Sequence, residues 1–423
     1  MSSKKSKKLQ ENTATKQFAL SKKIIIVAVI VALIASVSIV TCATRTTRTI
    51  AFYGISESQI SGLKTIITEI CEKEHLSFEY VVLDSEKRLE NQIPLSRKPQ
   101  ILFTTAGYPL ESALDIASKK GGVEPELTAG MTSSVRSAVR YLDLSQKIIA
   151  LPIVTSHYEV DIETAAFRNS GMRAINTWKD VEDFLKIQKR RVEYPIVFAG
   201  SDSDTFLDMI GAFCESIEGA DAYEQAVDIL SEGAKHFDAI KLAKELCDNP
   251  DSPLITTVRM LSSWYKNGFI HPGTFSFKNA DVEAFAQSKL SSVLFMPLEQ
   301  HRVFNQEAIS RFTSIYFPSS RTASSRVFTG KMIYAIPMIK SKDAETLVSH
   351  LVQKEYQEDL SRASGLAPVL AQCRTPDKQA DDARYWIAAT TAPLAGLSSE
   401  VYLSKEQKTK LSAEIAAKIR YGN

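Results

Sequence analysis

The chain has 423 residues, of which 44% are hydrophobic and 24% are charged, and it contains only five cysteines. This composition excludes a disordered chain, a collagen-like repeat and a disulfide-rich miniprotein. The length predicts two or three domains, and a formal net charge of +2 is too small to favour nucleic-acid binding.

The first 41 residues differ from the rest of the chain in charge and hydropathy. Residues 1–23 carry seven lysines and one glutamate, and residues 24–40 form an uncharged apolar run. A helix of that length spans about 25 Å, near the lower limit for a bilayer. Segment 1–41 is therefore predicted to be a basic cytoplasmic leader followed by a transmembrane or signal segment. The remaining body carries 44 basic and 48 acidic residues and is expected on the extracytoplasmic, periplasmic side, anchored to the cell membrane.

Cys42 follows the apolar run almost directly. This position resembles the lipidated cysteine of a bacterial lipoprotein signal. The preceding Ile39, Val40 and Thr41 depart from the pattern of that signal, which has a Leu first and a small Ala or Gly last. The alternative is an uncleaved signal anchor with an incidental cysteine. Both interpretations end with a membrane-tethered body.

The first half of the body alternates apolar runs with segments of helical periodicity. The predicted strands are 49–53, 78–82, 100–104 and 147–152, and the predicted helices are 58–74, 85–92 and 109–119. This order is typical of an α/β fold and predicts a mainly parallel sheet.

A second strand–helix series follows. Thr177 is a predicted N-cap of a helix that begins at Trp178, and residues 221–267 are predicted to be mostly helical with a break near Pro250. The other predicted strands are 195–199, 291–295, 314–317 and 331–336. One further predicted helix carries Phe206 and Phe213, and the others lie near 342–363, 380–391 and 404–419. The polar loop 319–325 is the clearest linker candidate.

The four remaining cysteines lack the spacing of a zinc site. Cys71, Cys214 and Cys247 lie within predicted helices, which favours buried free thiols. One disulfide in an oxidising compartment is the alternative.

Four loops that follow predicted strands are short and mostly rich in hydroxyl groups. Such loops bind ligands in open α/β sheets, because helix N-termini offer backbone N–H groups there. They suit a polar, uncharged or anionic ligand. For any one loop, the alternative is that its Ser or Asp only caps a helix. The candidate ligand-binding residues in and beside these loops are Tyr53, Gly54, Thr104, Thr105, Gly107, Tyr108, Ser201, Asp202, Ser203, Pro297 and Glu299.

No hydrolase, metalloprotease, P-loop or dinucleotide-binding motif occurs in the sequence, and no nucleophile–base pair stands out. We therefore expect no enzyme activity, no cofactor and no metal. Asp202 and Asp204 make only a weak calcium signal. His157 is the one histidine beside a presumed site, and a lone histidine is more often an ordinary hydrogen-bonding residue.

Five sequence blocks resemble, in order and spacing, the extracellular solute-binding proteins of ABC importers, in the group that binds sugars and oligosaccharides. The resemblance covers about residues 48–395. Its blocks are 144–152 (LSQKIIALP), 158–181, 263–272 (SWYKNGFIHP), 284–292 (AFAQSKLSS) and 329–368.

The resemblance implies the two-lobed periplasmic-binding-protein fold, with hinge crossovers near 153–155, 326–328 and 371–374. Lobe 1 would comprise 48–153 plus 327–372, and lobe 2 would comprise 154–326 plus 373–423. A small-molecule solute would lie between the lobes, and the closed protein would meet an ABC permease. Further candidate ligand-binding residues that follow from it are His157, Tyr158, Phe328, Thr329, Gly330, Tyr385 and Trp386.

The departures from the family pattern concern the ligand. Thr104, Thr105 and Leu298 stand where many relatives place aromatic rings, and sugars are commonly held by such rings. A maltodextrin-like ligand is therefore disfavoured. Trp386 lies where the family often has an aromatic ring that stacks on the sugar. The alternative is that its helix buries Trp386 in the core of the lobe. The expected function is a tethered carrier of a carbohydrate or similar polar solute. An anchored sensor or surface lipoprotein without transport is the alternative.

Overall fold

The computed structural model describes residues 48–94, 96–118, 121–142, 146–315, 317–318, 332–374, 381–382 and 394–422. Thr49–Asn423 forms one compact unit, to which all elements below belong. The predicted leader, Cys42 and the loop 319–325 lie outside the described residues. Within the described ranges, no helix is long and apolar enough to cross a membrane.

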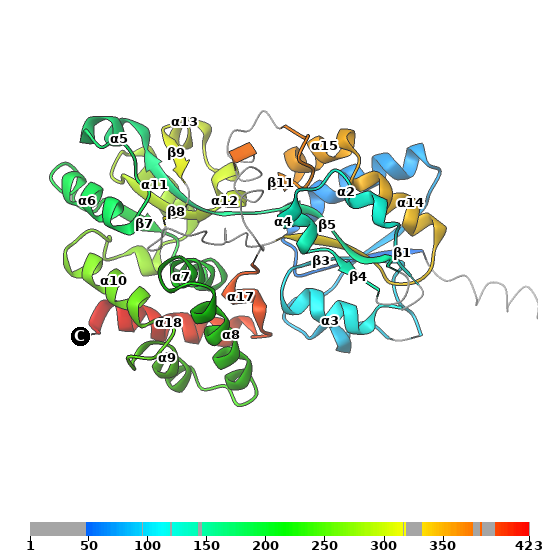
Figure 1. The fold of residues 1–423 in the computed structure, drawn as a ribbon, viewed down its shortest axis with the longest axis horizontal. Coiled ribbons are helices and arrows are strands. Elements are labelled where there is room, and N and C mark those ends of the chain that lie inside the picture. Colours follow the sequence, from blue (N-terminus) through cyan, green and yellow to red (C-terminus); the bar gives the residue numbers. More distant parts are fainter. Residues whose placement is uncertain are drawn as a thin grey trace, which may run out of the picture. The chain divides into compact units, whose positions relative to one another are not determined.

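The first sheet has seven strands in the order β11-β5-β10-β3-β1-β2, with β4 beside β5 (Figure 1). Its strands are β1 (Thr49–Tyr53), β2 (Glu79–Val82), β3 (Ile101–Thr105), β4 (Arg140–Tyr141), β5 (Ile148–Thr155), β10 (Ile333–Pro337) and β11 (Ala367–Pro368). β1 pairs in parallel with β2 and β3, whereas β10 is antiparallel to both β3 and β5. The four strands predicted in the first half of the body, β1, β2, β3 and β5, thus run in the same direction, but the antiparallel β4, β10 and β11 make the sheet mixed and not mainly parallel. β10 comes late in the chain and lies between β3 and β5 in the sheet. The local alternation of strands and helices does not predict this position.

Side chains of β1 alternate between two apolar layers. Ile50 and Phe52 belong to one buried cluster, and Ala51 and Tyr53 to another. The helices α2 (Glu57–Lys73), α14 (Lys342–Leu351) and α15 (Lys354–Ser364) cover the first face, and α3 (Tyr108–Ile116) covers the second (Figure 1). The single helix predicted over 342–363 is thus two helices, and the one predicted over 85–92 is only the 3-10 turn η1 (Leu89–Asn91). The shorter segments η2 (Pro125–Thr128) and α4 (Ser133–Ser137) follow α3.

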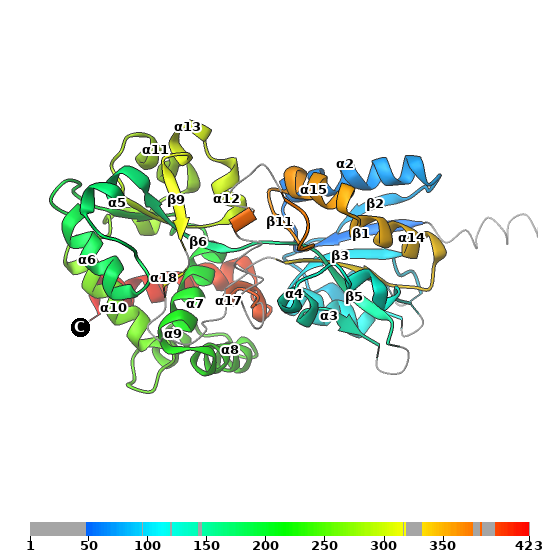
Figure 2. The same cartoon turned by 45° about the horizontal axis from the view of Figure 1, so that its top comes forward.

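The second sheet has four strands in the order β7-β8-β6-β9. They are β6 (Tyr158–Glu163), β7 (Ile196–Phe198), β8 (Val293–Pro297) and β9 (Phe312–Ile315). β6 is antiparallel to β8 and β9, and β7 is parallel to β8. The chain passes from the first sheet to the second between Thr155 and Tyr158, where β5 leads directly into β6 (Figure 2). β6 was not among the predicted strands, although Tyr158, Val160 and Ile162 alternate with acidic residues as in a half-buried strand.

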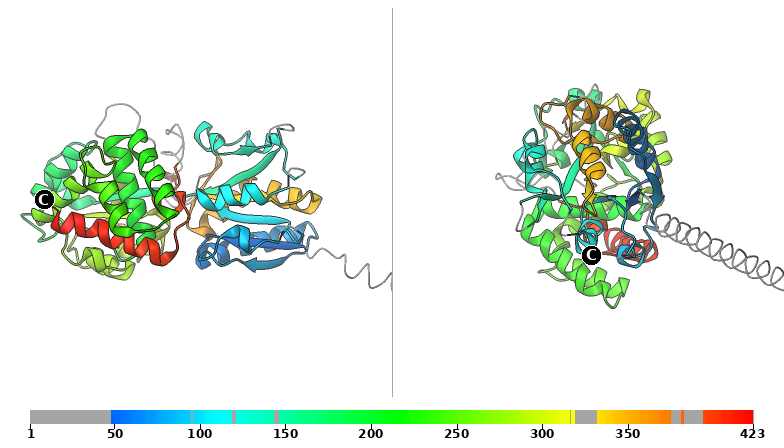
Figure 3. Two further views of the ribbon diagram at one scale, coloured as in Figure 1. Left: turned by 90° about the horizontal axis from the view of Figure 1, so that it is seen from below. Right: turned by 90° about the vertical axis from the view of Figure 1, so that its right-hand side faces the viewer.

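Helices surround the second sheet. They are α5 (Thr164–Ser170), α6 (Trp178–Gln188), α7 (Ser203–Glu218), α8 (Ala220–Ala234), α9 (Ala239–Cys247), α10 (Ile255–Lys266), α11 (Asn279–Gln287), α12 (Leu298–Val303), α13 (Gln306–Ile309), α17 (Leu397–Glu400) and α18 (Lys405–Tyr421), with the 3-10 turn η3 (Thr274–Ser276). Thr177 caps α6 in a capping box with Asp180, which confirms the predicted helix start. The C-terminal helix α18 packs against α7, α9 and α10 (Figure 3).

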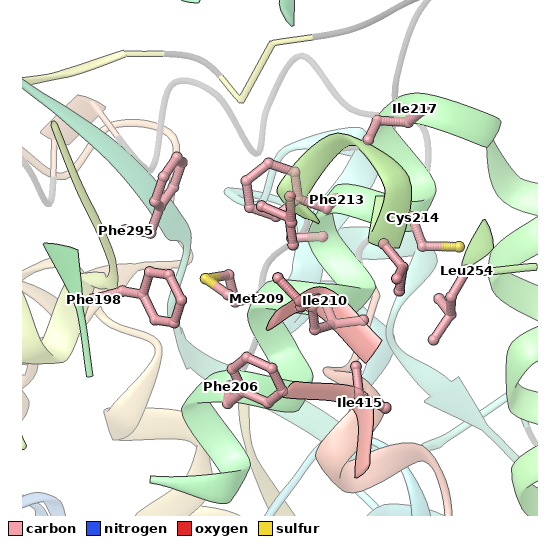
Figure 4. Close-up of a cluster of buried hydrophobic side chains, with 14 of the residues drawn as sticks. Phe198, Phe206, Met209, Ile210, Phe213, Cys214, Ile217, Leu254, Phe295 and Ile415 are labelled. Carbon is pink, nitrogen blue, oxygen red and sulfur yellow. The ribbon is translucent and has the colours of Figure 1, made fainter. Parts of the chain in front are cut away.

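The largest core is built around α7. Phe206, Met209 and Phe213 project from this helix towards Phe198 and Phe295 of the second sheet, whereas Ile210 projects to the side of Ile415 (Figure 4). Most residues of α7 are buried, because the sheet covers one side of the helix and α8, α10, α17 and α18 cover the others. These contacts hold α7 in place, so that its N-terminus has a defined position.

All four cysteines of the described body are buried free thiols, as predicted. Burial raises the pKa of Cys71 to about 11 and that of Cys247 to about 12. Thiols with such pKa values are scarcely ionised at neutral pH and act as small apolar side chains.

Candidate functional site

Three of the helices that follow strands are α2 after β1, α3 after β3 and α7 after β7, and tight turns orient their N-termini. Gly54 follows β1 with φ of 73°, and Gly107 follows β3 with φ of 84°. Such positive φ angles favour glycine, because a Cβ atom would clash with the backbone. The Ser56 hydroxyl accepts from the Gln59 N–H at 3.4 Å to cap α2, and Asp202 caps α7. A helix N-terminus carries partial positive charge and free N–H groups, so it favours ligand oxygen atoms.

These three helix starts border a cleft of about 660 Å³. Elements packed on both sheets contribute to its walls. On the side of the first sheet the polar and aromatic lining residues are Tyr53, Ser56, Ser85, Glu86, Thr105 and Tyr108. On the side of the second sheet they are Ser201, Asp202, Ser203, Asp204, Lys278, Asn279, Ser398, Ser399, Tyr402, Lys405, Lys408 and Thr409. The size is suited to a small solute such as a mono- or oligosaccharide.

Tyr108 and Tyr402 provide the aromatic surface of the cleft, and Tyr53, which is only 2% exposed, borders it. The ring centroids of Tyr108 and Tyr402 are 5.2 Å apart. The Tyr108 hydroxyl donates to the Glu90 carboxylate at 2.8 Å, and the Tyr53 hydroxyl donates to the Lys87 carbonyl at 2.9 Å. Burial, together with the Glu90 carboxylate, raises the pKa of Tyr108 to about 12. The phenol therefore remains neutral and its ring is held in place.

Glu86 joins the loop after β2 to the start of α18. Its carboxylate accepts from the backbone N–H of Lys405 at 2.9 Å, and its carbonyl accepts from the Tyr402 hydroxyl at 2.7 Å. Lys405 is the first residue of α18, so the carboxylate also satisfies a free N–H group at that helix start. The Arg88 guanidinium lies 4.8 Å from the centroid of the Tyr402 ring. The tyrosine is thus fixed through both its hydroxyl and its face.

The charges that line the cleft balance one another. Three carboxylates, from Glu86, Asp202 and Asp204, face three ammonium groups, from Lys278, Lys405 and Lys408. The Lys408 ammonium is 2.9 Å from an Asp204 oxygen. A cleft without net charge selects neither anions nor cations. It offers donors and acceptors on all sides, as a neutral polyhydroxylated solute requires.

The structure brings many of the sequence-predicted residues together. Those that line the cleft are Tyr53, Gly54, Thr105, Tyr108, Ser201, Asp202 and Ser203. Pro297 and Glu299 line a second hollow of about 390 Å³, which shares Asp202 and Asp204 with the cleft. Gly107 lines a third hollow, of about 270 Å³, beside Glu400.

Other predicted residues lie elsewhere. Thr104 is fully buried in β3, and His157 and Tyr158 are buried where β6 begins. Six candidates fall outside the described residues, namely Cys42, Phe328, Thr329, Gly330, Tyr385 and Trp386. The role of these six stays a prediction.

Sequence reasoning missed several lining residues, above all Tyr402, Lys405 and Glu86. The capping box that begins at Ser404 marks the start of α18, and this signal was available in the sequence. No local signal places Tyr402 beside Glu86, which is 316 positions earlier in the chain. Their meeting depends on the path of the whole chain.

Comparison with protein-family profiles and with characterised proteins finds no match to this sequence. Comparison with solved structures finds many similar folds. One is the bacterial solute receptor AcbH, with an exclusive preference for β-D-galactopyranose. It has 12% identity and a TM-score of 0.67, and the match covers 89% of this chain and 92% of the receptor.

Two more structures are similar over the same part of the chain. The binding protein MsmE from Bacillus subtilis, in an open conformation, has 14% identity and a TM-score of 0.66, with 88% and 93% of the two chains covered. The binding protein RafE in complex with raffinose has 12% identity and a TM-score of 0.60, with 87% and 98% covered. The chain therefore has the two-sheet α/β fold of solute-binding proteins that bind sugars, as the sequence predicted.

Proposed function

We propose that this chain is a membrane-tethered, extracytoplasmic solute-binding protein that delivers a carbohydrate or a similar polar solute to an ABC importer. The observation that carries the proposal is the cleft, in which the anchored rings of Tyr108 and Tyr402 and a charge-balanced set of hydroxyl, carboxylate and ammonium groups converge. Proteins of the same fold include one with a preference for β-D-galactopyranose and one in complex with raffinose.

Recognition of a sugar in this cleft would combine two kinds of contact. A pyranose has apolar C–H faces that pack on aromatic rings, and hydroxyl groups around its edge that both donate and accept. The rings of Tyr108 and Tyr402 supply the first contact. The carboxylates of Asp202 and Glu86 and the ammonium of Lys405 supply the second. No covalent step is involved, so the protein binds and releases its solute unchanged.

Delivery would depend on movement of two lobes. We assign 48–153 plus 327–372 to lobe 1 and 154–326 plus 373–423 to lobe 2, with the hinge at the passage from β5 to β6. A solute that contacts both lobes stabilises their closed arrangement, because only there are all contacts made at once. The closed form would then be the one that the permease recognises.

A thermal-shift screen tests the carbohydrate assignment. A ligand that binds only the folded chain stabilises it by about 2.7 kcal/mol at a concentration of 100 Kd. At least one member of a panel of monosaccharides, galactosides, other oligosaccharides and polyols should raise the Tm, whereas amino acids and dicarboxylates should not. Mass spectrometry of solutes that co-purify with the protein identifies the natural ligand. A response confined to the amino acids or dicarboxylates would contradict a carbohydrate ligand.

The tether has a separate test at Cys42. If Cys42 is lipidated, Cys42→Ala should leave the precursor unprocessed or released from the membrane. Protein size on a gel and the fraction retained in the membrane pellet report this directly. Unchanged size and retention in the variant would favour an uncleaved signal anchor instead.

A further inference from the structure

A polar cluster is buried in the second sheet, apart from the cleft. Glu159 and Asp161 are two residues apart on β6, so their side chains project from the same face of the sheet. Ser314 of β9 is directly opposite Asp161 in the strand register. His301 of α12 completes the cluster. The exposed fractions of Glu159, Asp161 and His301 are 0%, 0% and 2%, so water does not solvate them.

The hydrogen bonds within the cluster leave it short of donors. The His301 Nδ1 atom is 2.8 Å from Glu159 Oε2 and 3.3 Å from Asp161 Oδ1. The Ser314 hydroxyl is 2.7 Å from Asp161 Oδ1 and 3.1 Å from Glu159 Oε2. Each of these two donors carries at most one proton towards the carboxylates. Three further atoms, Glu159 Oε1, Asp161 Oδ2 and His301 Nε2, are buried without a hydrogen-bond partner.

The charge of the cluster is also unbalanced. Within the described part of the chain, neither Glu159 nor Asp161 pairs with a lysine or an arginine. The only side chain near them that can carry a positive charge is His301. The residues opposite them on β8 are Met296 and Leu294, which offer no polar atom from their side chains. Two carboxylates in an apolar layer are costly unless cations neutralise them. A divalent cation would cancel both charges at once.

We propose that Glu159, Asp161 and His301 bind one divalent transition-metal ion, zinc in the first instance, as a structural site. One nitrogen or oxygen atom of each residue lies within 4.8 Å of the others, and the Ser314 hydroxyl adds a fourth oxygen. Zinc accepts mixed nitrogen and carboxylate ligands in a small four-coordinate site. Calcium requires six to eight oxygens and magnesium retains several waters, whereas this cluster offers few ligand atoms and is closed to solvent.

The ion would connect the sheet to α12. His301 is on this short helix, and its neighbours Glu299, Gln300 and Arg302 line the second hollow beside the cleft. Metal binding would therefore hold α12 against β6 and fix the position of that hollow. The metal site is independent of the proposed sugar binding, because none of its three ligands lines the cleft.

Metal analysis of the purified full-length protein tests the proposal. Elemental mass spectrometry should find one zinc per chain. Chelation should lower the Tm, and Zn²⁺ should restore it, whereas Ca²⁺ or Mg²⁺ should not. Co²⁺ added to the chelated protein should produce the visible absorption bands of a four-coordinate site, and X-ray anomalous scattering at the zinc edge should place the ion between the three side chains.

Variants locate the ion. His301→Ala and Asp161→Asn should abolish stoichiometric zinc and the Co²⁺ bands. The matched control is His350→Ala, which removes another histidine that contacts a carboxylate, that of Glu74 at 3.2 Å, and should leave both unchanged. If a variant fails to fold, the Co²⁺ spectrum and the anomalous signal of the wild-type protein show whether the three side chains bind the ion. A wild-type protein that binds neither Zn²⁺ nor Co²⁺ overturns the proposal, as does a folded His301→Ala variant that keeps its zinc.

Discussion

The tyrosines of the cleft have their hydroxyl groups already engaged by the protein. Tyr53 donates to the Lys87 carbonyl, Tyr108 to Glu90 and Tyr402 to the Glu86 carbonyl. A hydroxyl that is bonded in this way contributes little new hydrogen bonding to a solute. What Tyr108 and Tyr402 offer is the aromatic ring, held rigidly at low cost in conformational entropy, whereas Tyr53 is buried. This favours a ligand with both an apolar face and a polar edge.

Tyr402→Ala should weaken binding of the sugar identified in the screen by at least about 1 kcal/mol, roughly fivefold in Kd, because it removes a stacking surface. Tyr402→Phe should retain most of the affinity, since the ring remains. Titration calorimetry measures both. Tyr421→Ala is the control, because Tyr421 is 70% exposed at the C-terminal end of α18, far along the chain from Tyr402, which precedes that helix. Equal affinity of Tyr402→Ala and wild type would remove Tyr402 from the site.

Asp202 has two roles that substitution can separate. Its carboxylate lines the cleft and accepts from the Thr205 N–H at 2.8 Å as the cap of α7. Asp202→Ala should lower the free energy of unfolding by about 1 kcal/mol and also weaken sugar binding. Asp202→Asn preserves a good cap and should weaken binding with little loss of stability. Denaturant unfolding and calorimetry provide the two measurements.

The control for Asp202 is Asp238→Ala. Asp238 caps α9 by accepting from the Lys241 N–H at 3.0 Å and does not line the cleft. It should show the same loss of stability with unchanged affinity. If Asp202→Asn binds sugar as well as wild type does, the carboxylate contributes only as a helix cap.

At the scale of elements, the cleft depends on how closely the start of α3 approaches α17. Gly107 has φ of 84° and ψ of −147°, a region that only glycine populates readily. A Cβ atom there would lie 2.2 Å from the Ser399 carbonyl oxygen. Two physical constraints therefore require glycine at this position, one from the backbone and one from the neighbouring element.

Comparison of two glycine variants separates these constraints. Gly171→Ala replaces a glycine with φ of 75° and no atom within 4 Å of the new Cβ, so it should cost only about 1–2 kcal/mol of unfolding free energy from backbone strain. Gly107→Ala should cost clearly more and should also weaken sugar binding, because α17 must move. Equal losses in denaturant unfolding would show that the contact with Ser399 adds nothing.

Several elements follow from local sequence, and others do not. The helix after Thr177 and the helix after Asp202 were predictable, because a capping residue precedes a run with helical periodicity. β6 has a local signal that the prediction did not use, since Glu159 and Asp161 alternate with apolar residues as in a half-exposed strand. That pattern would turn both carboxylates to solvent. The fold instead buries both, and this exception to the usual pattern is what points to the metal site.

At the scale of the whole molecule, the cleft is composite. Its walls come from loops at the ends of β1, β3 and β7 and from the segment between α17 and α18. Its charges cancel, although the leader of 23 residues is strongly basic and the body is mildly acidic. The net charge of the chain thus reflects the leader and gives no information about the solute.

Ligand binding should make the body more compact if the two proposed lobes close on the solute. Small-angle X-ray scattering should show a smaller radius of gyration with a saturating concentration of the bound sugar than without it. A sugar that gives no thermal shift serves as the control, and Tyr402→Ala should need more ligand for the same change. Binding without any change in the radius of gyration would contradict closure.

The sequence by itself determined the α/β class, the loops that follow β1, β3 and β7, the buried free cysteines and the resemblance to solute-binding proteins. These depend on short-range patterns, namely apolar periodicity, caps and turn residues, which a few neighbouring positions encode. Only the tertiary structure decided the direction of β10, the meeting of Tyr402 with Glu86 and the burial of Glu159 and Asp161 beside His301. These depend on contacts between distant segments, and the packing of the complete chain sets such contacts.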